Sequence, residues 1–219
     1  KKRNPDAVVV AVGCYVQTGK EEALLDGSID LAVGNNRKKD LLPILEAFLE
    51  ERERNRAETG RDAAVDVKTL HHTSVVDISR EEAYEEMSLS GWNKEDGGAS
   101  QRTRAYIKIQ DGCNQFCSYC IIPYARGRVR SRKQEDILKE VRGLAREGYK
   151  EIVFTGIHIS SYGMDFIDKS DGDYLENGKA LRGTAMERAY LLNLVREIAE
   201  VDGIERIRLG SLEPRIITE

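Results

Sequence analysis

Short apolar runs alternate with helical periods along much of the chain. The runs lie at residues 6–12, 29–33, 104–110, 151–155 and 205–209, and each has the length of a buried strand. Between them, apolar residues recur at intervals of three and four at residues 41–58, in the segment that ends at Gly148, and at about 187–201. Strands that alternate with helices in this way predict parallel sheets, and therefore the α/β fold class.

Polar residues and one glycine signal the ends of two of these helices. Asp40 is expected to cap the helix that begins at Leu41. Ser131 and Gln134 have the spacing of a capping box, which predicts that the second helix opens there. Gly148 is expected to end that helix in the usual C-terminal position.

The strand and helix patterns stop between residues 81 and 101. This stretch is acidic at first and then rich in glycine, so it is expected to be a linker. It divides the chain into an α/β domain at residues 1–80 and a second α/β domain at residues 102–219. A chain of 219 residues is long enough for two modest domains of this kind.

Three of the four cysteines stand close together in the segment that follows residues 104–110. Cys113, Cys117 and Cys120 form a CxxxCxxC array. Three thiolates at this spacing can bind three irons of a four-iron cluster, because cysteine is the usual protein ligand of iron–sulfur clusters. The fourth iron would then stay open for another ligand.

A disulfide framework and a zinc site are the other interpretations of the same segment. Disulfides are disfavoured, because the chain has four cysteines and three of them lie within eight residues. A structural zinc ion usually has four ligands, and the fourth would have to come from Cys14 or a distant histidine. The cluster is therefore favoured over zinc. Few cysteines with a metal-type spacing also favour a reducing cytoplasm.

Charge is unevenly distributed along the chain. The formal net charge of −4 argues weakly against a nucleic-acid partner. Between Gln101 and Lys133, however, eight Lys or Arg residues stand against one acid, Asp111, so the local charge is +7. Contacts of Lys and Arg with phosphates supply most of the sequence-independent affinity for nucleic acid. This stretch is therefore a candidate nucleic-acid surface, with a solvated basic face as the alternative.

The cysteine segment and its surroundings resemble the methylthiotransferases of the radical S-adenosylmethionine (SAM) superfamily. The superfamily motif is CxxxCxΦC, in which Φ is aromatic, and Tyr119 occupies that position. The resemblance extends to Thr-Gly-Ile-His-Ile-Ser-Ser-Tyr-Gly at 155–163 and to Arg-Ile-Arg-Leu-Gly-Ser-Leu-Glu-Pro at 206–214. Both stretches are most similar to the bacterial branch that acts on N6-threonylcarbamoyladenosine in tRNA.

The resemblance implies a more specific fold. Residues 102–219 are expected to form the first half of a radical SAM (βα)6 partial barrel, and residues 1–80 a partial N-terminal methylthiotransferase domain. In the family this domain carries three cysteines that bind an auxiliary 4Fe–4S cluster, and Gly13-Cys14-Tyr15 resembles the segment with the third of them. The chain is therefore expected to be an internal part of a longer enzyme.

The resemblance also implies a reaction. It implies a transferase that replaces the C2 hydrogen of the modified adenosine next to the anticodon with a methylthio group. One SAM would methylate sulfur at the auxiliary cluster, and a second, bound to the open iron of the 4Fe–4S cluster, would give the radical that removes the hydrogen. The implied partners are tRNA and an electron donor such as a flavodoxin or ferredoxin, with no membrane.

Three alternatives to this function stay open. Two are methylthiotransferases, one for isopentenyladenosine in tRNA and one for a ribosomal protein. The third is not an enzyme but a zinc-stabilised module that binds tRNA.

Candidate site residues follow from the resemblance and from their positions at strand ends, where ligands of parallel α/β folds bind. The predicted ligands of the 4Fe–4S cluster are Cys113, Cys117 and Cys120, and Cys14 is a candidate for the auxiliary cluster. Candidate cofactor-binding residues are Tyr119, Thr155, Gly156, Ser211 and Glu213. Candidate substrate-binding residues are Arg126, Arg128, Arg130 and His158. The structural alternatives are a buried thiol at Cys14, a tight turn at Gly156 and a solvated face for the arginines.

Overall fold

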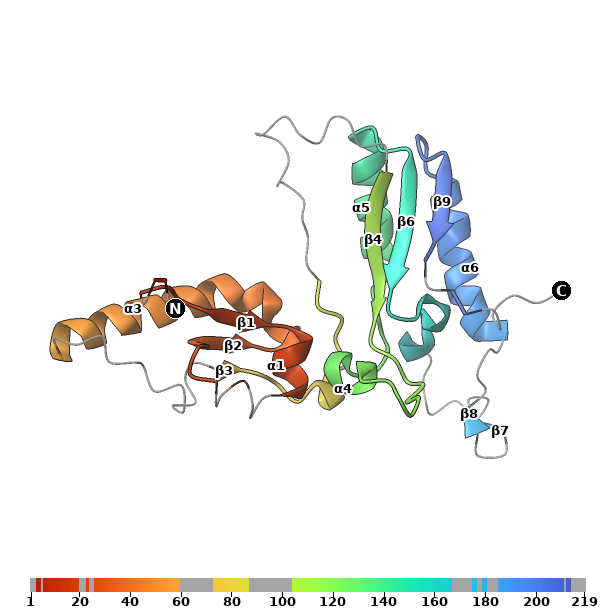
Figure 1. Ribbon diagram of the computed structural model, residues 1–219. Coiled ribbons are helices and arrows are strands. Elements are labelled where there is room, and N and C mark those ends of the chain that lie inside the picture. The colour runs from red at the N-terminus through yellow and green to blue at the C-terminus, as the bar shows by residue number, and fades with distance from the viewer. Residues whose placement is uncertain are drawn as a thin grey trace. The chain divides into compact units, whose positions relative to one another are not determined.

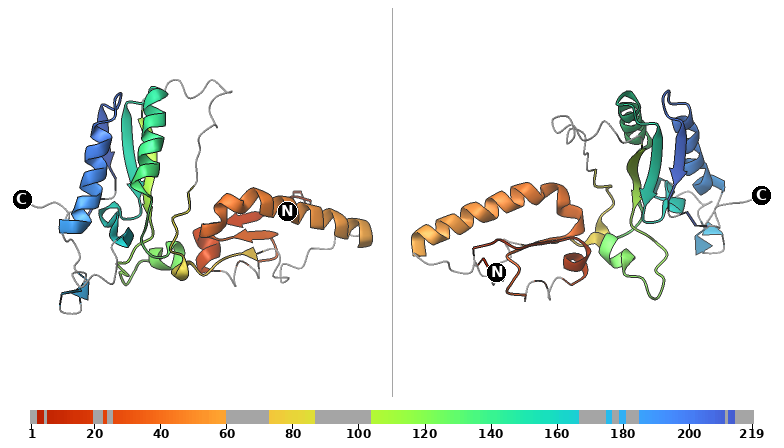
Figure 2. Two further views of the ribbon diagram at one scale, coloured as in Figure 1. Left: turned by 180° about the vertical axis from the view of Figure 1, so that it is seen from behind. Right: turned by 45° about the horizontal axis from the view of Figure 1, so that its top comes forward.

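The computed structural model describes residues 3–4, 6–19, 23, 26–59, 73–86, 104–166, 175–176, 179–180, 185–210 and 212–213. They belong to two units: unit 1 comprises residues 1–81 and 117–127, and unit 2 comprises residues 82–116 and 128–219. Figures 1 and 2 show the elements of each unit. Most of the predicted linker at 81–101 lies outside the described residues. The proposed division at that linker therefore stays a prediction.

Unit 1 contains a three-stranded parallel sheet in the order β1-β2-β3. β1 (Val10–Val12) and β2 (Leu31–Val33) lie within the two predicted strands, whereas β3 (Thr73–Ser74) was not predicted. α1 (Cys14–Thr18) follows β1, and the 3-10 helix η1 (Asn35–Asp40) follows β2 and leads into α3 (Leu41–Thr59). α4 (Ile122–Arg126) also belongs to this unit.

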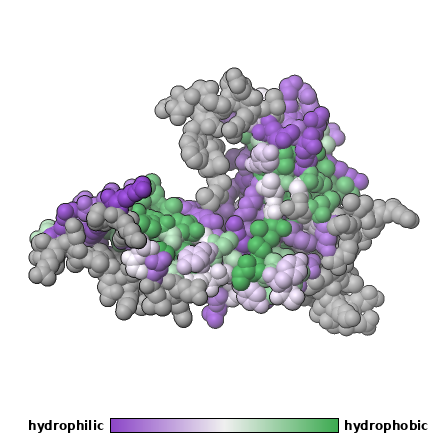
Figure 3. All heavy atoms as spheres, in the orientation of Figure 1, coloured by the Kyte–Doolittle hydropathy of each residue, from purple (hydrophilic) through white to green (hydrophobic). Residues whose placement is uncertain are grey.

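The two faces of the unit 1 sheet pack against different helices. Leu31 and Val33 of β2 pack with Phe48 of α3, whereas Ala32, which points to the opposite face, packs with Val16 of α1. The C-terminal part of α3 is charged and forms a purple stretch in Figure 3. No helix in the described part of the chain has the length and apolar character that crossing a membrane requires.

Unit 2 contains a four-stranded sheet in the order β5-β4-β6-β9. β4 (Arg104–Asp111), β6 (Glu151–Gly156) and β9 (Arg206–Leu209) are parallel, and the short β5 (Arg130–Ser131) runs antiparallel to β4. α5 (Gln134–Arg146) precedes β6, and α6 (Ala185–Ala199) precedes β9. Both helices cover the same face of the sheet (Figures 1 and 2). The predicted α/β class, with strands and helices in alternation, is confirmed.

The core of unit 2 lies between this sheet and its two helices. Ala105, Ile107 and Ile109 of β4 are buried, while Tyr106 and Lys108 between them are exposed. This period of two is expected of a strand that is covered on one face. The helices complete the core with Ile137, Leu138 and Val141 from α5 and Leu191, Leu194 and Ile198 from α6.

The two predicted helix caps are wrong. α5 begins at Gln134 after Lys133, which makes no capping hydrogen bond with its side chain. Ser131 lies in β5 instead, where its hydroxyl accepts a hydrogen bond from the Gly163 N–H (2.8 Å) and is not available to a helix. Asp40 is the last residue of η1, which runs directly into α3 and leaves no open helix end to cap. The predicted end of α5 just before Gly148 is confirmed.

Candidate functional site

The segment with the three cysteines starts at the carboxyl end of β4 and leads to β5, which pairs with β4. Beyond this ladder, Asn114 Oδ1 accepts a hydrogen bond from the Val129 N–H (3.2 Å). The Arg128 guanidinium lies 4.3 Å from the centre of the Phe116 ring. The end of β4 and the first part of the cysteine segment, residues 110–116, are therefore held to residues 128–131 within unit 2.

The three predicted ligands differ in exposure. Cys113 is 9% exposed and belongs to unit 2, whereas Cys117 is exposed, Cys120 is partly exposed, and both belong to unit 1. Tyr119 is 90% exposed. None of the four cysteines of the chain forms a disulfide. The described residues contain no group of three Cys, His, Asp or Glu that could hold a metal ion, so the ligand roles stay a prediction.

The donor chemistry of the segment fits an iron–sulfur cluster. It offers three thiols within eight residues. The Gln115 N–H already donates a hydrogen bond to Cys113 Sγ (3.4 Å), and hydrogen bonds to sulfur tune the potentials of such clusters. Cys14 in α1 is the fourth cysteine. Cys14 would supply one thiolate of an auxiliary cluster, and its role there stays a prediction.

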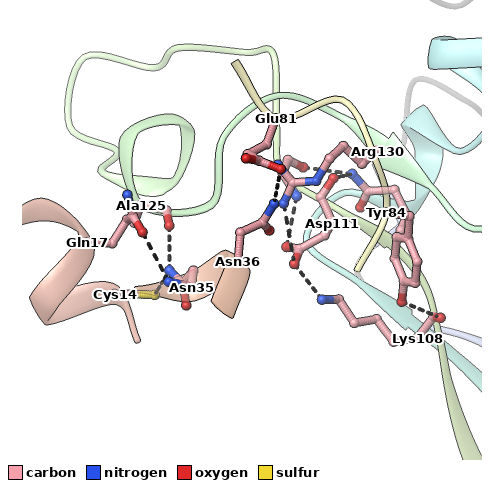
Figure 4. Close-up of polar contacts among 12 residues, drawn as sticks. Cys14, Gln17, Asn35, Asn36, Glu81, Tyr84, Lys108, Asp111, Ala125 and Arg130 are labelled. Carbon is pink, nitrogen blue, oxygen red and sulfur yellow. Dashed lines mark hydrogen bonds and ion pairs between the residues drawn. The ribbon is translucent and has the colours of Figure 1, made fainter. Parts of the chain in front are cut away.

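Cys14 lies in a hydrogen-bonded group within unit 1 (Figure 4). Asn35, which is 4% exposed, donates from Nδ2 to Cys14 Sγ (3.3 Å) and to the Ala125 carbonyl (2.5 Å). The Asn35 N–H donates to Gln17 Oε1 (3.1 Å). Asn35 thus links α1, which contains Cys14 and Gln17, to α4, which contains Ala125.

At the carboxyl end of β4, one buried side chain organises the backbone. The pairing of β4 with β6 shifts register just before Gln110, and both Ile109 and Gln110 are 0% exposed although neighbours on a regular strand face opposite sides. Gln110 Nε2 donates to the carbonyls of Asp111 and Gly112, both at 2.7 Å. Its Oε1 accepts from the His158 N–H (2.8 Å). Gln110 therefore joins the start of the cysteine segment to the loop after β6.

Gly156, at the end of β6, leaves the space that Gln110 occupies. A Cβ at this position would lie 3.0 Å from both Gln110 O and Gln110 Oε1, and 2.8 Å from Ile159 Cγ2. The side chains and backbone that approach Gly156 are therefore this chain's own, and a contact of Gly156 with SAM stays a prediction. The hydroxyl of the neighbouring Thr155 donates to the Ile107 carbonyl (3.3 Å).

His158 and Glu213 were predicted to bind different molecules, and the structure brings them together. His158 Nε2 lies 3.0 Å from Glu213 Oε2, and His158 Nδ1 lies 2.6 Å from Ser161 Oγ. The Glu213 N–H donates to Ser160 Oγ (2.8 Å). Because both ring nitrogens have partners, the imidazole holds the loop after β6 to the segment after β9. Ser211 lies outside the described residues.

The three predicted substrate-binding arginines have different environments. Arg128 is exposed, and Arg126, in α4 of unit 1, is partly exposed. Arg130 is 1% exposed, and its Nη2 lies 4.0 Å from Asp111 Oδ2, so it presents almost no surface to a phosphate. The same Asp111 oxygen accepts from Lys108 Nζ at 2.5 Å (Figure 4).

Comparisons with known proteins address the same part of the chain. Residues 107–188, which run from β4 into α6, match the radical SAM superfamily. The chain is 36% identical over 97% of its length to the threonylcarbamoyladenosine tRNA methylthiotransferase MtaB of Aquifex aeolicus. It is 33% identical over its whole length to the MtaB of Bacillus subtilis. The resemblance to radical SAM methylthiotransferases is confirmed.

A third relative has a different substrate in its name. The chain is 32% identical over its whole length to the tRNA-2-methylthio-N(6)-dimethylallyladenosine synthase of Carboxydothermus hydrogenoformans. The chain covers 41%, 39% and 40% of the lengths of these three relatives, in the order given. It therefore spans about two fifths of the curated methylthiotransferases that it matches.

This radical SAM match confirms two predictions made from the sequence, one about the fold and one about the cofactors. The succession β4-α5-β6-α6-β9 is the expected first part of a radical SAM barrel, and that part of the fold prediction is confirmed. The predicted cofactors, 4Fe–4S clusters and SAM, are confirmed as those of the radical SAM methylthiotransferases.

Gln110 and Asn35 are the two residues of this region that sequence analysis missed. Gln110 lies inside β4 next to its register shift, and Asn35 follows Gly34 at the end of β2; each is buried with its side chain on backbone groups. A buried polar side chain needs partners, but the sequence shows neither the burial nor the partners. The signal that could have found Gln110 is a polar residue at the end of a buried strand run, three residues before the first cysteine of the segment.

Proposed function

We propose that this protein acts in the methylthiolation of tRNA, as the radical SAM enzyme that adds a methylthio group to C2 of N6-threonylcarbamoyladenosine next to the anticodon. The observation that carries the proposal is the CxxxCxxC segment at the carboxyl end of β4, which lies within the residues that match the radical SAM superfamily. The similarity to two threonylcarbamoyladenosine tRNA methylthiotransferases supports the choice of substrate.

Cys113, Cys117 and Cys120 would hold the 4Fe–4S cluster through three thiolates. When bound, the cluster and SAM supply the radical chemistry that removes an unactivated hydrogen, which no protein side chain does unaided. Tyr119, with an exposed aromatic ring, and Thr155, at the end of β6, are the candidates for contact with SAM.

Other side chains of unit 2 would orient the site. The His158–Glu213 pair fixes the loop after β6 against the segment after β9, and so shapes the rim at which ligands of parallel sheets bind. Arg128 is exposed beside the cysteine segment and offers a guanidinium to the phosphates of tRNA. These roles are positioning and binding, and none of them needs a proton transfer.

The proposed reaction requires an electron donor and a reducing environment. Reductive cleavage of SAM needs an electron, so a donor such as a flavodoxin or ferredoxin would serve the enzyme. Thiols at metal-type spacing with no disulfide between them fit a reducing cytoplasm, where tRNA is also found.

A second candidate function is methylthiolation of N6-dimethylallyladenosine in tRNA. The 32% identity to the Carboxydothermus hydrogenoformans synthase favours it, because this identity is close to the values for the two MtaB proteins.

Mass spectrometry of tRNA nucleosides from cells that lack the gene tests both candidates. We expect the 2-methylthio derivative of N6-threonylcarbamoyladenosine to disappear and its precursor to accumulate. The complete gene should restore the product, and the same gene with Cys117→Ala should not. Loss of the dimethylallyladenosine derivative instead would select the second candidate. A colourless purified protein that contains zinc and no iron would contradict both enzymes and favour a zinc-stabilised tRNA-binding module.

A further inference from the structure

We propose that Gln110 is a positioning residue that sets the backbone leading into the cysteine segment and couples it to the loop after β6. The inference rests on the proposed role of this segment as the ligand loop of a cluster. It assigns a task to a residue that is neither a ligand nor part of the cysteine motif.

The side chain of Gln110 forms its hydrogen bonds with backbone groups. A carboxamide has two N–H donors and one carbonyl acceptor. Both donors go to carbonyls, those of Asp111 and Gly112, and the acceptor takes the His158 N–H. These partners fix which end of the amide is nitrogen, because two of them can only accept and one can only donate. At 0% exposure, no water competes for these bonds.

The two carbonyls belong to the residues immediately before Cys113. β4 loses its regular pairing with β6 at the register shift, so the side chain of Gln110 satisfies groups that a ladder would otherwise satisfy. Gly112 has a φ of +73°, which turns the backbone between Asp111 and Cys113 into a region that favours glycine. The Asp111 carboxylate accepts from the Gly112 N–H (2.9 Å) on the other side of this turn.

The other end of the carboxamide reaches the loop after β6. Gly156 leaves room for it, and the His158 side chain continues the connection to Glu213 at 3.0 Å. The carboxyl ends of β4, β6 and β9 are thus joined through His158: its N–H donates to Gln110 Oε1, and its ring contacts the Glu213 carboxylate. A change at the ends of β6 or β9 therefore reaches the backbone that carries Cys113.

Two variants separate the positioning role from general packing. Gln110→Glu keeps the shape and an acceptor for the His158 N–H, but it puts an oxygen in place of the amide nitrogen opposite the two carbonyls. Gln110→Ala removes all three bonds. Val141→Ala is the control, because Val141 is buried in the same core on α5 and lies away from the ends of the strands. It should lower stability without moving the turn before Cys113.

The first measurement needs no cluster. In the metal-free complete protein, iodoacetamide labelling followed by peptide mass spectrometry gives the rate at Cys113, which is 9% exposed, relative to the exposed Cys117. We expect Gln110→Glu and Gln110→Ala to raise the Cys113 to Cys117 ratio about tenfold, because the turn loses two hydrogen bonds. Val141→Ala should leave the ratio unchanged. An unchanged ratio in Gln110 variants that remain folded by thermal unfolding would overturn the proposal.

The second measurement uses the reconstituted complete protein. Its readouts are iron content and the electron paramagnetic resonance spectrum of the reduced cluster, with and without SAM. We expect Gln110→Glu to weaken the SAM-induced spectral change while Val141→Ala keeps it. A normal spectrum and a normal labelling ratio in Gln110→Glu would refute the positioning role alone. A wild-type protein that binds no iron would instead refute the proposed function, and the labelling ratio would still decide the role of Gln110.

Discussion

The surroundings of single residues depend on partners that come from distant parts of the chain. Glu151, buried at the start of β6, bonds Arg104 (2.6 Å), Arg208 (2.6 Å) and Arg206 (3.1 Å). Burial acts most strongly on its pKa and raises it, but hydrogen bonds from the three arginines together lower the pKa below its ordinary value. Arg104 and Arg206 stand opposite Glu151 in the register of β4 and β9, which no local pattern reveals.

Glu151→Gln should lower the stability of the protein at neutral pH and flatten its loss in acid. The folded pKa of Glu151 is below the unfolded value, so its contribution is present above the unfolded pKa of about 4.3 and is lost as pH falls through the folded pKa. The arginine side chains are 45–62% exposed, so solvent screening limits the effect. Urea unfolding at a series of pH values measures it, with Glu205→Gln, which breaks an exposed pair with Lys150, as the control. An identical loss of stability in acid for wild type and Glu151→Gln would show that the ion pairs of Glu151 contribute nothing to the free energy of unfolding.

The ligand assignment is a prediction about three residues that are close in sequence. In the complete protein, Cys113→Ala, Cys117→Ala and Cys120→Ala should each remove the SAM-responsive iron–sulfur signal after anaerobic reconstitution, because a cluster held by two thiolates is unstable. Cys14→Ala is the matched control and should retain that signal. A triple variant that keeps the signal would exclude this segment as the cluster site.

The sequence reveals the part of the site whose residues are close together along the chain, and it does not reveal contacts between distant residues. Cys113, Cys117 and Cys120 are local in sequence, so their spacing alone predicts a three-thiolate site. By contrast, Gln110 bonds His158, which is 48 residues away, and Asn35 bonds Ala125, which is 90 residues away. Such contacts exist only after the sheet has formed.

At the scale of elements, length decided what could be predicted. Five strands, β1, β2, β4, β6 and β9, coincide with apolar runs of five to seven residues in the sequence, and the helices α3, α5 and α6 are long enough to show a helical period. β3 and β5 have two residues each, and α1 and α4 have five each, which is too short for a period. Their positions come from contacts with the rest of the unit, as the bond between Ser131 of β5 and Gly163 shows.

Ser131→Ala should therefore destabilise unit 2 by about 1–3 kcal/mol, because the buried Gly163 N–H would lose its acceptor. Hydrogen exchange locates the effect: the Gly163 amide should lose protection while the first turn of α5 keeps it. Loss of protection at the first turn of α5 alone would restore the capping role that the sequence predicted. Ser79→Ala is the control, since the Ser79 hydroxyl bonds only the exposed Asp77 carboxylate among the contacts described for it and should cost little.

At the scale of the whole molecule, the count of charges overstates the basic surface. Of the residues that give the +7 segment, Arg130 is buried, and three others pair with acids: Lys108 with Asp111 of the segment itself, and Arg104 and Arg132 with acids from elsewhere in the chain. The ion pairs are Arg104 with Glu151, Lys108 with Asp111, and Arg132 with Glu86 and Glu140. Local charge in the sequence therefore predicts a nucleic-acid surface only where the fold leaves the cations exposed.

Arg128 is such an exposed cation, and it makes the proposed tRNA interaction testable. Arg128→Gln should reduce the slope of log affinity for tRNA against log salt concentration by about 0.7–0.9, the value for one lost phosphate contact. Arg196→Gln, which removes an exposed charge from α6, is the control and should leave the slope unchanged.

An unchanged slope in Arg128→Gln would mean that this guanidinium serves the fold. Its contact with the Phe116 ring at 4.3 Å provides that alternative, because Phe116 has a φ of +48°, a backbone conformation that a bulky residue rarely adopts without support. Phe116→Ala separates the two roles: it removes the stacking partner but no charge. If Arg128 binds phosphate, Phe116→Ala should lower the affinity for tRNA while the salt slope stays that of the wild type. A drop in thermal stability that is equal in Arg128→Gln and Phe116→Ala, with no change in tRNA binding for either, would assign the pair to the fold alone.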